Sequence, residues 1–211
     1  MLVPPKFVLS EDDAWGAVQQ RVFGTLVVGT SSGFEATPLP WIACDDSGVR
    51  NLRGHISAAN PLVDLLQSPQ RGIILFEVAD AYISPNWYPS KIETGKVVPT
   101  WNYVTVHCQG ILERFEDPSE LRRNVHDLTD AMEHDRAEPW KVTDAPEDYV
   151  DQLLRGIVGV NLRIDRIEGK AKLSQNRSLS EATGAFNGLL QESPASPLLP
   201  HQRGALEQRS D

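Results

Sequence analysis

The chain has little cysteine and no long apolar run, and each absence excludes a class of protein. Its 211 residues include only two cysteines, Cys44 and Cys108, which lie far apart and lack the spacing of metal ligands. We therefore expect no disulfide framework, no metal site and a reducing compartment. No apolar stretch approaches the roughly 20 residues that span a bilayer, and Met1–Ser10 lacks the apolar core of a secretory signal. The sequence thus predicts a soluble, cytoplasmic protein.

Positive charge is also scarce. The chain carries 29 acidic side chains against 20 lysines and arginines, a formal net charge of -9. Nucleic-acid binders usually present a positive surface, because neutralising phosphates supplies most of their affinity. One local cluster stands against this trend, although Asp165 and Glu168 interrupt it: Arg163, Arg166, Lys170, Lys172 and Arg177. DNA is therefore a weak candidate partner, confined to residues 163–177.

The common nucleotide-binding and hydrolase motifs are absent. The sequence contains no Gly-x-Gly-x-x-Gly turn, no Walker loop and no Gly-x-Ser-x-Gly elbow. A doubly wound nicotinamide-binding domain is not expected on that basis.

The hydrophobic periodicity predicts a mainly β chain with helices. Helices are expected at 11–22, from Asn60-Pro61 to Ser68, at 118–132 and at 146–155, and strands at 25–30, 35–43, 49–56, 73–78, 97–115 and 160–164. Short turns between the strands favour antiparallel pairing and a β-barrel with helices packed outside. The Pro- and Ser-rich segment 191–211 is expected to form a flexible tail behind a single domain at 1–190.

The segment Trp101–Gly110 has the most informative pattern. Because strand side chains alternate between faces, Val104, Val106 and Cys108 share a core face. The opposite face carries rings and hydrogen-bonding groups in place of charges: Trp101, Tyr103, Thr105, His107 and Gln109. Such a face is typical of a ligand site or a subunit interface. An ordinary amphipathic strand with large residues at its edge explains the pattern equally well.

A second polar face lies on the strand predicted at 49–56, where Arg53, His55 and Ser57 follow Asn51 at alternate positions. A planar guanidinium with nearby hydrogen-bond donors is what a phosphate group requires. The helix start at Asn60 follows directly. A surface strand with its polar side outward is the simpler alternative, and spacing alone favours it.

Residues 81–91 combine the aromatic side chains Tyr82, Trp87 and Tyr88 with two prolines. The prolines restrict the chain and the rings provide stiff contact area, so this loop either walls a site or packs over the barrel.

Four separated motifs together resemble the PaiB family in order and spacing. They are Gly54–Pro61 (GHISAANP), Ala81–Tyr88 (AYISPNWY), Val98–Tyr103 (VPTWNY) with His107, and Lys172–Asn176 (KLSQN). The resemblance covers roughly residues 1–190.

The resemblance implies the FMN-binding split-barrel fold, shared with pyridoxamine phosphate oxidases. In that fold two subunits pack together and the flavin lies between them, so FMN and a homodimer are expected. The phosphate would contact the segment that contains Arg53, His55, Ser57 and Asn60, with Lys91 as a helper. The flavin ring or the partner subunit would meet the segment that contains Trp101, Asn102, Tyr103 and His107. The oxidases carry several basic residues at the phosphate, whereas Arg53 stands nearly alone here.

The family resemblance also implies a role. PaiB members are described as negative transcriptional regulators linked to sporulation and degradative enzymes, and a regulator is expected here. The alternative is a flavin-dependent oxidoreductase acting on a small planar substrate, with His55, Trp101, Tyr103 and His107 on the substrate side. A dimer without any ligand is the third hypothesis. No catalytic residue is assigned.

Overall fold

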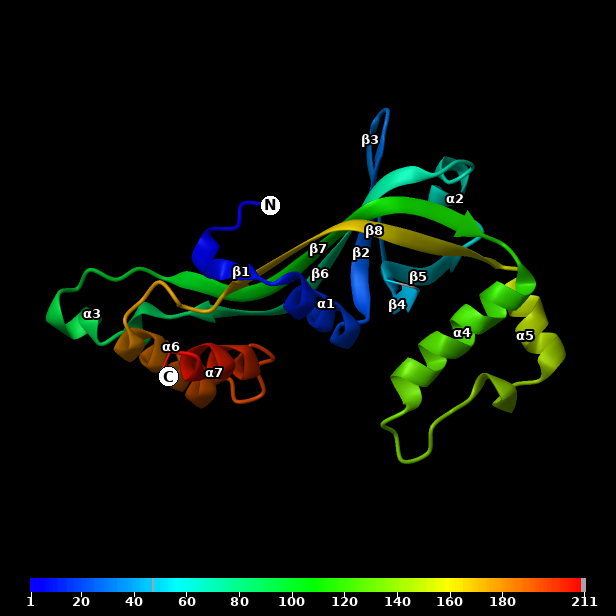
Figure 1. Cartoon of the computed structure of the whole chain (residues 1–211). Coiled ribbons are helices and arrows are strands. Elements are labelled where there is room, and N and C mark those ends of the chain that lie inside the picture. Colours follow the sequence, from blue (N-terminus) through cyan, green and yellow to red (C-terminus); the bar gives the residue numbers. More distant parts are fainter. Residues whose placement is uncertain (47, 210–211) are drawn as a thin grey trace. The chain divides into compact units, whose positions relative to one another are not determined.

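The computed structural model describes residues 1–46 and 48–209, which form a mainly antiparallel sheet and several helices (Figure 1). The strands are β1 (Val8–Leu9), β2 (Phe23–Thr30), β3 (Gly33–Pro40), β4 (Ile42–Asp46), β5 (Val49–Ser57), β6 (Gln70–Ile83), β7 (Thr100–Phe115) and β8 (Ile157–Lys172). The α-helices are α1 (Glu11–Gln20), α2 (Leu62–Leu65), α3 (Ser90–Glu93), α4 (Pro118–Glu133), α5 (Glu147–Leu154), α6 (Leu179–Glu192) and α7 (Leu199–Glu207). Short 3-10 turns occupy Pro5–Phe7, Pro85–Trp87 and Val142–Asp144. The predicted mainly β class with helices is confirmed.

The predicted strand at 35–43 is two strands, because the chain turns at Trp41. The indole is buried, its Nε1 donates to the Gly24 carbonyl at 3.2 Å, and the backbone N–H of Trp41 donates to the Val22 carbonyl at 2.7 Å. These bonds anchor the turn, and β4 then pairs with β5. β6 and β8 are longer than predicted, since charged residues at their exposed positions disguise the alternation.

The strands follow the order β3-β2-β6-β7-β8-β5-β4, and β1 pairs with β8. Two compact units share β6, β7 and β8. The terminal unit comprises Met1–Ala17, Glu77–Val106 and residues 168–209, and the central unit comprises Val18–Phe76 and His107–Ile167. None of the helices formed by the described residues combines the length and apolarity needed to cross a membrane.

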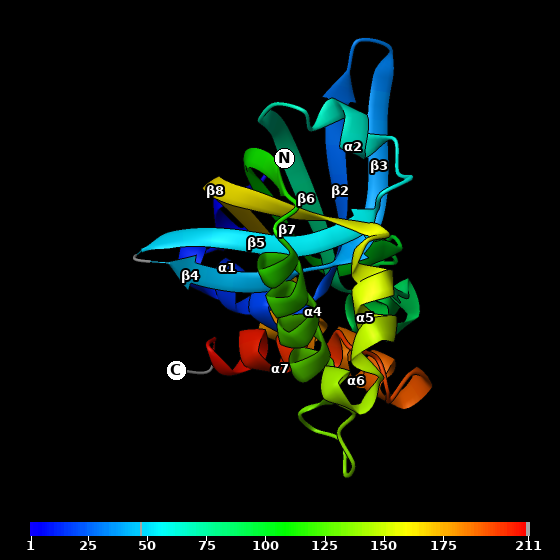
Figure 2. The same ribbon diagram turned by 90° about the vertical axis from the view of Figure 1, so that its right-hand side faces the viewer.

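In the central unit, α4 lies beside β4 and β5, and α5 packs against α4 (Figure 2). α4 begins as its sequence predicts: Asp117 Oδ1 accepts from the backbone N–H groups of Ser119 and Glu120 at 2.9 and 3.1 Å, and Pro118 occupies the first helical position. One stripe of α4 is buried, namely Leu121, Asn124 and Leu128. This stripe brings α4 over the sheet.

Gly54 of β5 allows a close approach of two backbones. A β-carbon at this position would lie 2.8 Å from the Pro40 carbonyl oxygen and 3.3 Å from the Trp41 ring. Any larger residue would therefore push β5 away from the Pro40–Trp41 turn.

Both thiols lie in the central unit and neither forms a disulfide. Burial raises the pKa of Cys108, on the core face of β7, to about 12. Burial also raises the pKa of Cys44 on β4, although the charge of Arg53 opposes the shift.

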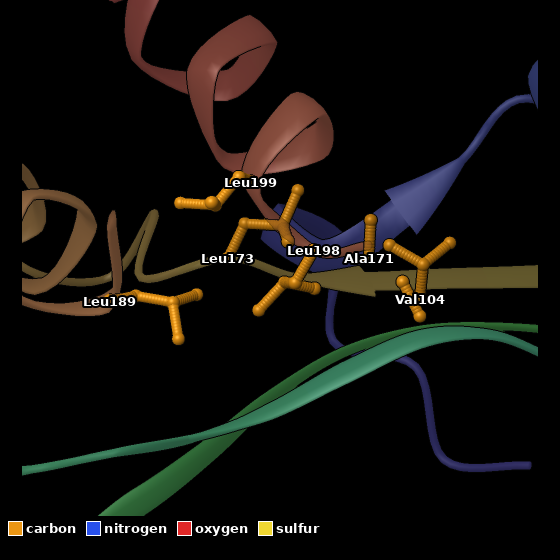
Figure 3. Close-up of a cluster of buried hydrophobic side chains, with 7 residues drawn as sticks. Val104, Ala171, Leu173, Leu189, Leu198 and Leu199 are labelled. Carbon is orange, nitrogen blue, oxygen red and sulfur yellow. The ribbon is translucent and has the colours of Figure 1, made fainter. Parts of the chain in front are cut away.

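The core of the terminal unit joins β6, β7 and β8 to the two C-terminal helices (Figure 3). Its buried side chains are Ala79, Val104, Ala171, Leu173, Leu189, Leu198 and Leu199. α6 fits tightly against Trp87, because a β-carbon at Gly188 would lie 2.2 Å from the indole. The segment 171–199 therefore contributes buried side chains to this core.

Within residues 191–209, the described part of the segment expected to form a flexible tail, the structure contains a helix. Residues 199–207 form α7, and Leu198, at its start, is completely buried. Composition pointed to a tail because Pro, Ser and Gln surround this pair of leucines, yet two large buried side chains hold the segment in place.

We expect Leu198→Ala to lower the free energy of unfolding by about 2–5 kcal/mol, because it leaves a cavity in a closed core. Leu190→Ala, on α6 at a position 40% exposed, is the matched control and should change it by less than about 0.5 kcal/mol. Urea denaturation followed by circular dichroism measures both. Equal effects would show that the α7 segment is not packed as described.

Candidate functional site

The two faces of β7 are as the sequence predicts. Val104, Val106 and Cys108 are buried, whereas Trp101 is 52% exposed and Tyr103 is partly exposed. Thr105, His107 and Gln109 are also partly exposed, at alternate positions along the same strand. Trp101 and Tyr103, in the terminal unit, are therefore exposed enough to contact a ligand or another subunit.

The exposed face of β7 contributes to a cavity in the terminal unit, here called the Trp101 cavity. It has a volume of about 410 Å³ and is lined by Glu77, Ala79, Asp80, Trp101, Tyr103, Val104 and Thr105. Neither Glu77 nor Asp80 has a hydrogen-bond or ion-pair partner among the described residues. The cavity thus combines aromatic walls with two unpaired carboxylates.

Neighbouring groups hold the rings of the Trp101 cavity. Tyr82 meets Trp101 edge to face, with ring centroids 6.2 Å apart and planes at 75°. Lys170 Nζ lies 5.2 Å from the centroid of Tyr103 and donates to the Leu2 carbonyl at 3.2 Å. These contacts fix the orientation of both walls.

Asn102, which the family motif groups with Trp101 and Tyr103, lies on the opposite face of β7. Its side chain is fully buried, and its Nδ2 donates to Ser174 Oγ at 2.9 Å. Ser174 adopts a left-handed φ of 71°. Gln175 closes the same turn, since its Oε1 accepts from the Leu173 N–H at 2.6 Å and its Nε2 donates to the Ala171 carbonyl at 2.7 Å. The third and fourth family motifs therefore meet inside the terminal unit.

Lys91 lies on the short, exposed helix α3 of the terminal unit. Its Nζ donates to Asn86 Oδ1 at 2.6 Å. The Lys91 side chain is thus paired with a residue five positions earlier in the sequence.

Arg53 belongs to the central unit and is held by a ring. Its guanidinium carbon lies 4.9 Å from the centroid of Phe115. The Arg53 side chain has no hydrogen bond or ion pair within the described part of the chain. It lines a polar cavity of about 300 Å³ with Asp46, Asn51, Glu113, Arg114, Phe115, Glu120 and Asn161. A partly buried guanidinium without a hydrogen-bond or ion-pair partner can bind an anion.

His55 follows Arg53 on the same face of β5 and meets α4. Its Nδ1 lies 3.1 Å from the Nδ2 of Asn124, whose side chain is 1% exposed. Burial lowers the pKa of His55, so its ring is neutral near neutral pH. His107, also in the central unit, is partly exposed on β7.

Ser57 and Asn60 serve the turn after β5. Ser57 Oγ accepts from the Ala59 N–H at 3.2 Å. Asn60 Oδ1 accepts from the Leu62 N–H at 2.9 Å and its Nδ2 donates to Thr37 Oγ1 at 3.3 Å. The helix expected from Asn60-Pro61 to Ser68 is shorter than predicted, because α2 covers only Leu62–Leu65.

The predicted site residues therefore fall into two groups. Arg53, His55, Ser57, Asn60 and His107 belong to the central unit, and Lys91, Trp101, Asn102 and Tyr103 belong to the terminal unit. In the described residues there is no cluster of three or more His, Cys, Asp or Glu side chains suited to a metal ion.

Sequence reasoning missed Phe115, Asn124 and the carboxylates of Glu77 and Asp80. One signal was available for Asn124, because it interrupts an apolar stripe at helical spacing between Leu121 and Leu128. No such signal marks Phe115, because its contact with Arg53 depends on the tertiary structure.

Comparison with known proteins identifies the family. Residues 1–166 match the family described as "Putative FMN-binding domain". The chain belongs to this family. The predicted FMN-binding family, and with it FMN as the family's cofactor, is confirmed.

Curated relatives of this FMN-binding family member come from bacteria and fungi. "Protease synthase and sporulation protein PAI 2" of Bacillus subtilis is 28% identical over 193 residues, covering 91% of this chain and 90% of that protein. "Uncharacterized protein AFUA_5G13800" of Aspergillus fumigatus is 35% identical over 171 residues, covering 65% of each chain. The chain thus spans about two thirds of the length of this fungal relative. The predicted resemblance to PaiB is confirmed.

Solved structures agree on the fold. The "FAD and Heme binding protein" of Mycobacterium smegmatis superposes with a TM-score of 0.57 at 14% identity, covering 77% of this chain and 71% of that one. The predicted split-barrel fold is confirmed.

The residues present fit a flavin when each unit is considered by itself. The Trp101 cavity offers aromatic walls to a planar ring. In the central unit, Arg53 offers a guanidinium that contacts the Phe115 ring but makes no hydrogen bond or ion pair with a described residue, as a phosphate would require. Three carboxylates, those of Asp46, Glu113 and Glu120, line the same cavity as Arg53, and the other cation of this cavity, Arg114, is paired with Glu116 at 3.3 Å.

We expect Asn102→Ala to lower the free energy of unfolding by about 1–3 kcal/mol, because it removes a buried hydrogen bond to Ser174. Asn86→Ala, which removes an exposed contact to Lys91, should leave stability nearly unchanged. Urea denaturation measures both. An unchanged free energy of unfolding in Asn102→Ala would contradict the structural role of this amide.

Proposed function

We propose that this chain binds FMN as a cytoplasmic homodimer and acts as a negative transcriptional regulator of the PaiB type. The observation that carries the flavin-binding part is the unpaired guanidinium of Arg53, held over Phe115 in a polar cavity. Two free cysteines support a reducing compartment.

Arg53 is proposed to bind the phosphate of FMN. The Phe115 ring holds the guanidinium by a cation–π contact, which leaves the guanidinium N–H groups to donate to phosphate oxygens. His55 and Ser57 follow Arg53 at alternate positions of β5, with about 6.6 Å between successive positions. They add neutral hydrogen-bond donors. Because carboxylates line the same cavity and its other cation, Arg114, is paired with Glu116, the phosphate affinity is proposed to depend mainly on Arg53.

Trp101 and Tyr103 are proposed to bind the flavin ring or the partner subunit. Trp101, Tyr82 and Val98 are large apolar side chains of the terminal unit that remain 52%, 47% and 64% exposed. Covering them with a ligand or a second copy would remove apolar surface from water. When bound, FMN supplies the capacity for electron transfer, and these residues would orient it and exclude water.

The regulator role rests on the family and not on a basic surface. The Bacillus subtilis relative is named for protease synthesis and sporulation. The cations of residues 170–177 are engaged within the terminal unit: Lys170 with Leu2 and Tyr103, Lys172 with Thr100 at 2.6 Å, and Arg177 over Tyr88 at 4.7 Å. We therefore propose that regulation acts through the flavin or a protein partner, without direct DNA binding by this segment.

A flavin-dependent oxidoreductase is the second candidate, and the Trp101 cavity favours it. Its volume of about 410 Å³ leaves room for a small planar substrate beside the aromatic walls. Oxidation of reduced nicotinamide with added FMN, at a rate above that of free FMN, would support this candidate.

We expect Arg53→Ala to weaken FMN binding about ten- to hundredfold, because a charge-assisted contact to the phosphate is lost. Riboflavin lacks the phosphate, so its affinity should stay the same in the variant. Quenching of flavin fluorescence during titration of the full chain measures both ligands.

Arg50→Ala is the matched control for this experiment. Arg50 lies on the same strand as Arg53 but at a position of opposite alternation, so FMN affinity should be retained. An FMN affinity unaffected by Arg53→Ala, or an equal loss of riboflavin affinity, would contradict the phosphate assignment.

We expect the purified chain not to retard duplex DNA in a gel at about 50 mM salt, where non-specific phosphate contacts are strong. The net charge of -9 and the engaged cations give the physical reason. A sequence-specific shift would contradict the proposed indirect regulation but would not bear on the proposed FMN binding.

A further inference from the structure

The buried stripe of α4 contains one polar residue. Leu121 and Leu128 are apolar, as expected for a helix packed on a sheet, whereas Asn124 between them is an amide that is only 1% exposed. A buried amide lowers stability unless its hydrogen bonds are satisfied. Asn124 Oδ1 nevertheless has no partner among the described residues. The contact made by the other end of the amide is therefore the feature that explains this residue.

That contact joins Asn124 Nδ2 to His55 Nδ1 at 3.1 Å. An amide nitrogen carries only hydrogens to donate, so the Nδ1 of the imidazole must accept. In a neutral ring the single proton then lies on Nε2. Burial, which lowers the pKa of His55, is consistent with this neutral ring.

We propose that Asn124 is a positioning residue that holds His55 in the tautomer with its proton on Nε2. His55 thereby presents a neutral hydrogen-bond donor on the Arg53 face of β5. His55 Nε2 has no hydrogen-bond partner in the described chain and is not one of its fully buried polar atoms. The opposite tautomer would present a lone pair there, which repels an anion.

The assigned tautomer completes a row of three donors on β5. Arg53 contributes a guanidinium, His55 an Nε2–H group and Ser57 a hydroxyl whose oxygen already accepts from Ala59. The identity of the acceptor, the anionic part of FMN, rests on the proposed function. The role of Asn124 toward His55 does not depend on it.

The first test observes the tautomer directly. In the flavin-free full chain with ¹⁵N-labelled histidine, long-range ¹H–¹⁵N correlation spectra distinguish protonated from unprotonated ring nitrogens, and His55→Gln assigns the signals. We expect His55 to show a protonated Nε2 and an unprotonated Nδ1. A protonated Nδ1 would overturn the proposal, whatever the affinity for FMN.

Two substitutions then test whether Asn124 sets the tautomer. Asn124→Asp places an acceptor at both ends of the side chain and should move a proton to Nδ1. Asn124→Leu keeps the branched shape but removes the donor, and should give a mixture of both tautomers. Thr129→Val, elsewhere on α4, removes a hydroxyl that donates to the Val125 carbonyl at 2.8 Å and should change neither nitrogen. An unchanged His55 spectrum in both Asn124 variants would overturn the proposal.

Flavin titration separates this proposal from the proposed function. Asn124→Leu should weaken FMN about two- to tenfold, the loss expected for one neutral hydrogen bond, and should spare riboflavin. Circular dichroism confirms that each variant is folded. If the wild-type chain shows the expected tautomer but binds no FMN, flavin binding fails and the role of Asn124 stands. If FMN binds and Asn124→Leu leaves its affinity intact, the positioning role toward FMN is overturned.

Discussion

The two-residue alternation along β7 is the constraint on which the candidate site depends. A shift of the strand by one residue would bury Trp101 and Tyr103 and expose the Asn102–Ser174 contact. Two features prevent such a shift in the central unit. Cys108 and Leu112 are fully buried, and a β-carbon at Gly110 would lie 2.0 Å from the Arg163 carbonyl oxygen, so that only glycine fits against β8 there. The exposed aromatic face therefore follows from the packing of the opposite face.

The sequence was sufficient to predict the elements whose local signals agree with their packing. The faces of β7 and the start of α4 at Asp117-Pro118 are examples, because alternation and capping act within a few residues. Asn102 shows the limit of motif reasoning. Its place in the family motif groups it with Trp101 and Tyr103, whereas alternation places it with Val104 on the buried face. The physical rule was the better guide, since adjacency in sequence says nothing about which face a side chain occupies.

Contacts across long sequence separations could not be predicted. His55 and Asn124 are 69 residues apart, and Arg53 meets the ring of Phe115, which lies at the end of another strand. One pairing depends on where α4 packs against β5, and the other on the end of β7, which β8 separates from β5 in the sheet. The donor row on β5 could be recognised from alternate positions, but the groups that orient its members became visible only in the folded chain. The C-terminal leucines are a similar case, because their surroundings in sequence are polar and their surroundings in space are apolar.

The protonation state of the two thiols determines how they react with oxidants formed at a flavin. Reduced flavins exposed to oxygen are a source of hydrogen peroxide, and peroxide attacks thiolates much faster than protonated thiols. With a pKa near 12, Cys108 is almost wholly protonated at neutral pH, and the shift at Cys44 is in the same direction. Neither cysteine is thus a fast target for sulfenic acid formation. An oxidant formed beside the chain would thus meet both thiols mainly in their less reactive, protonated form.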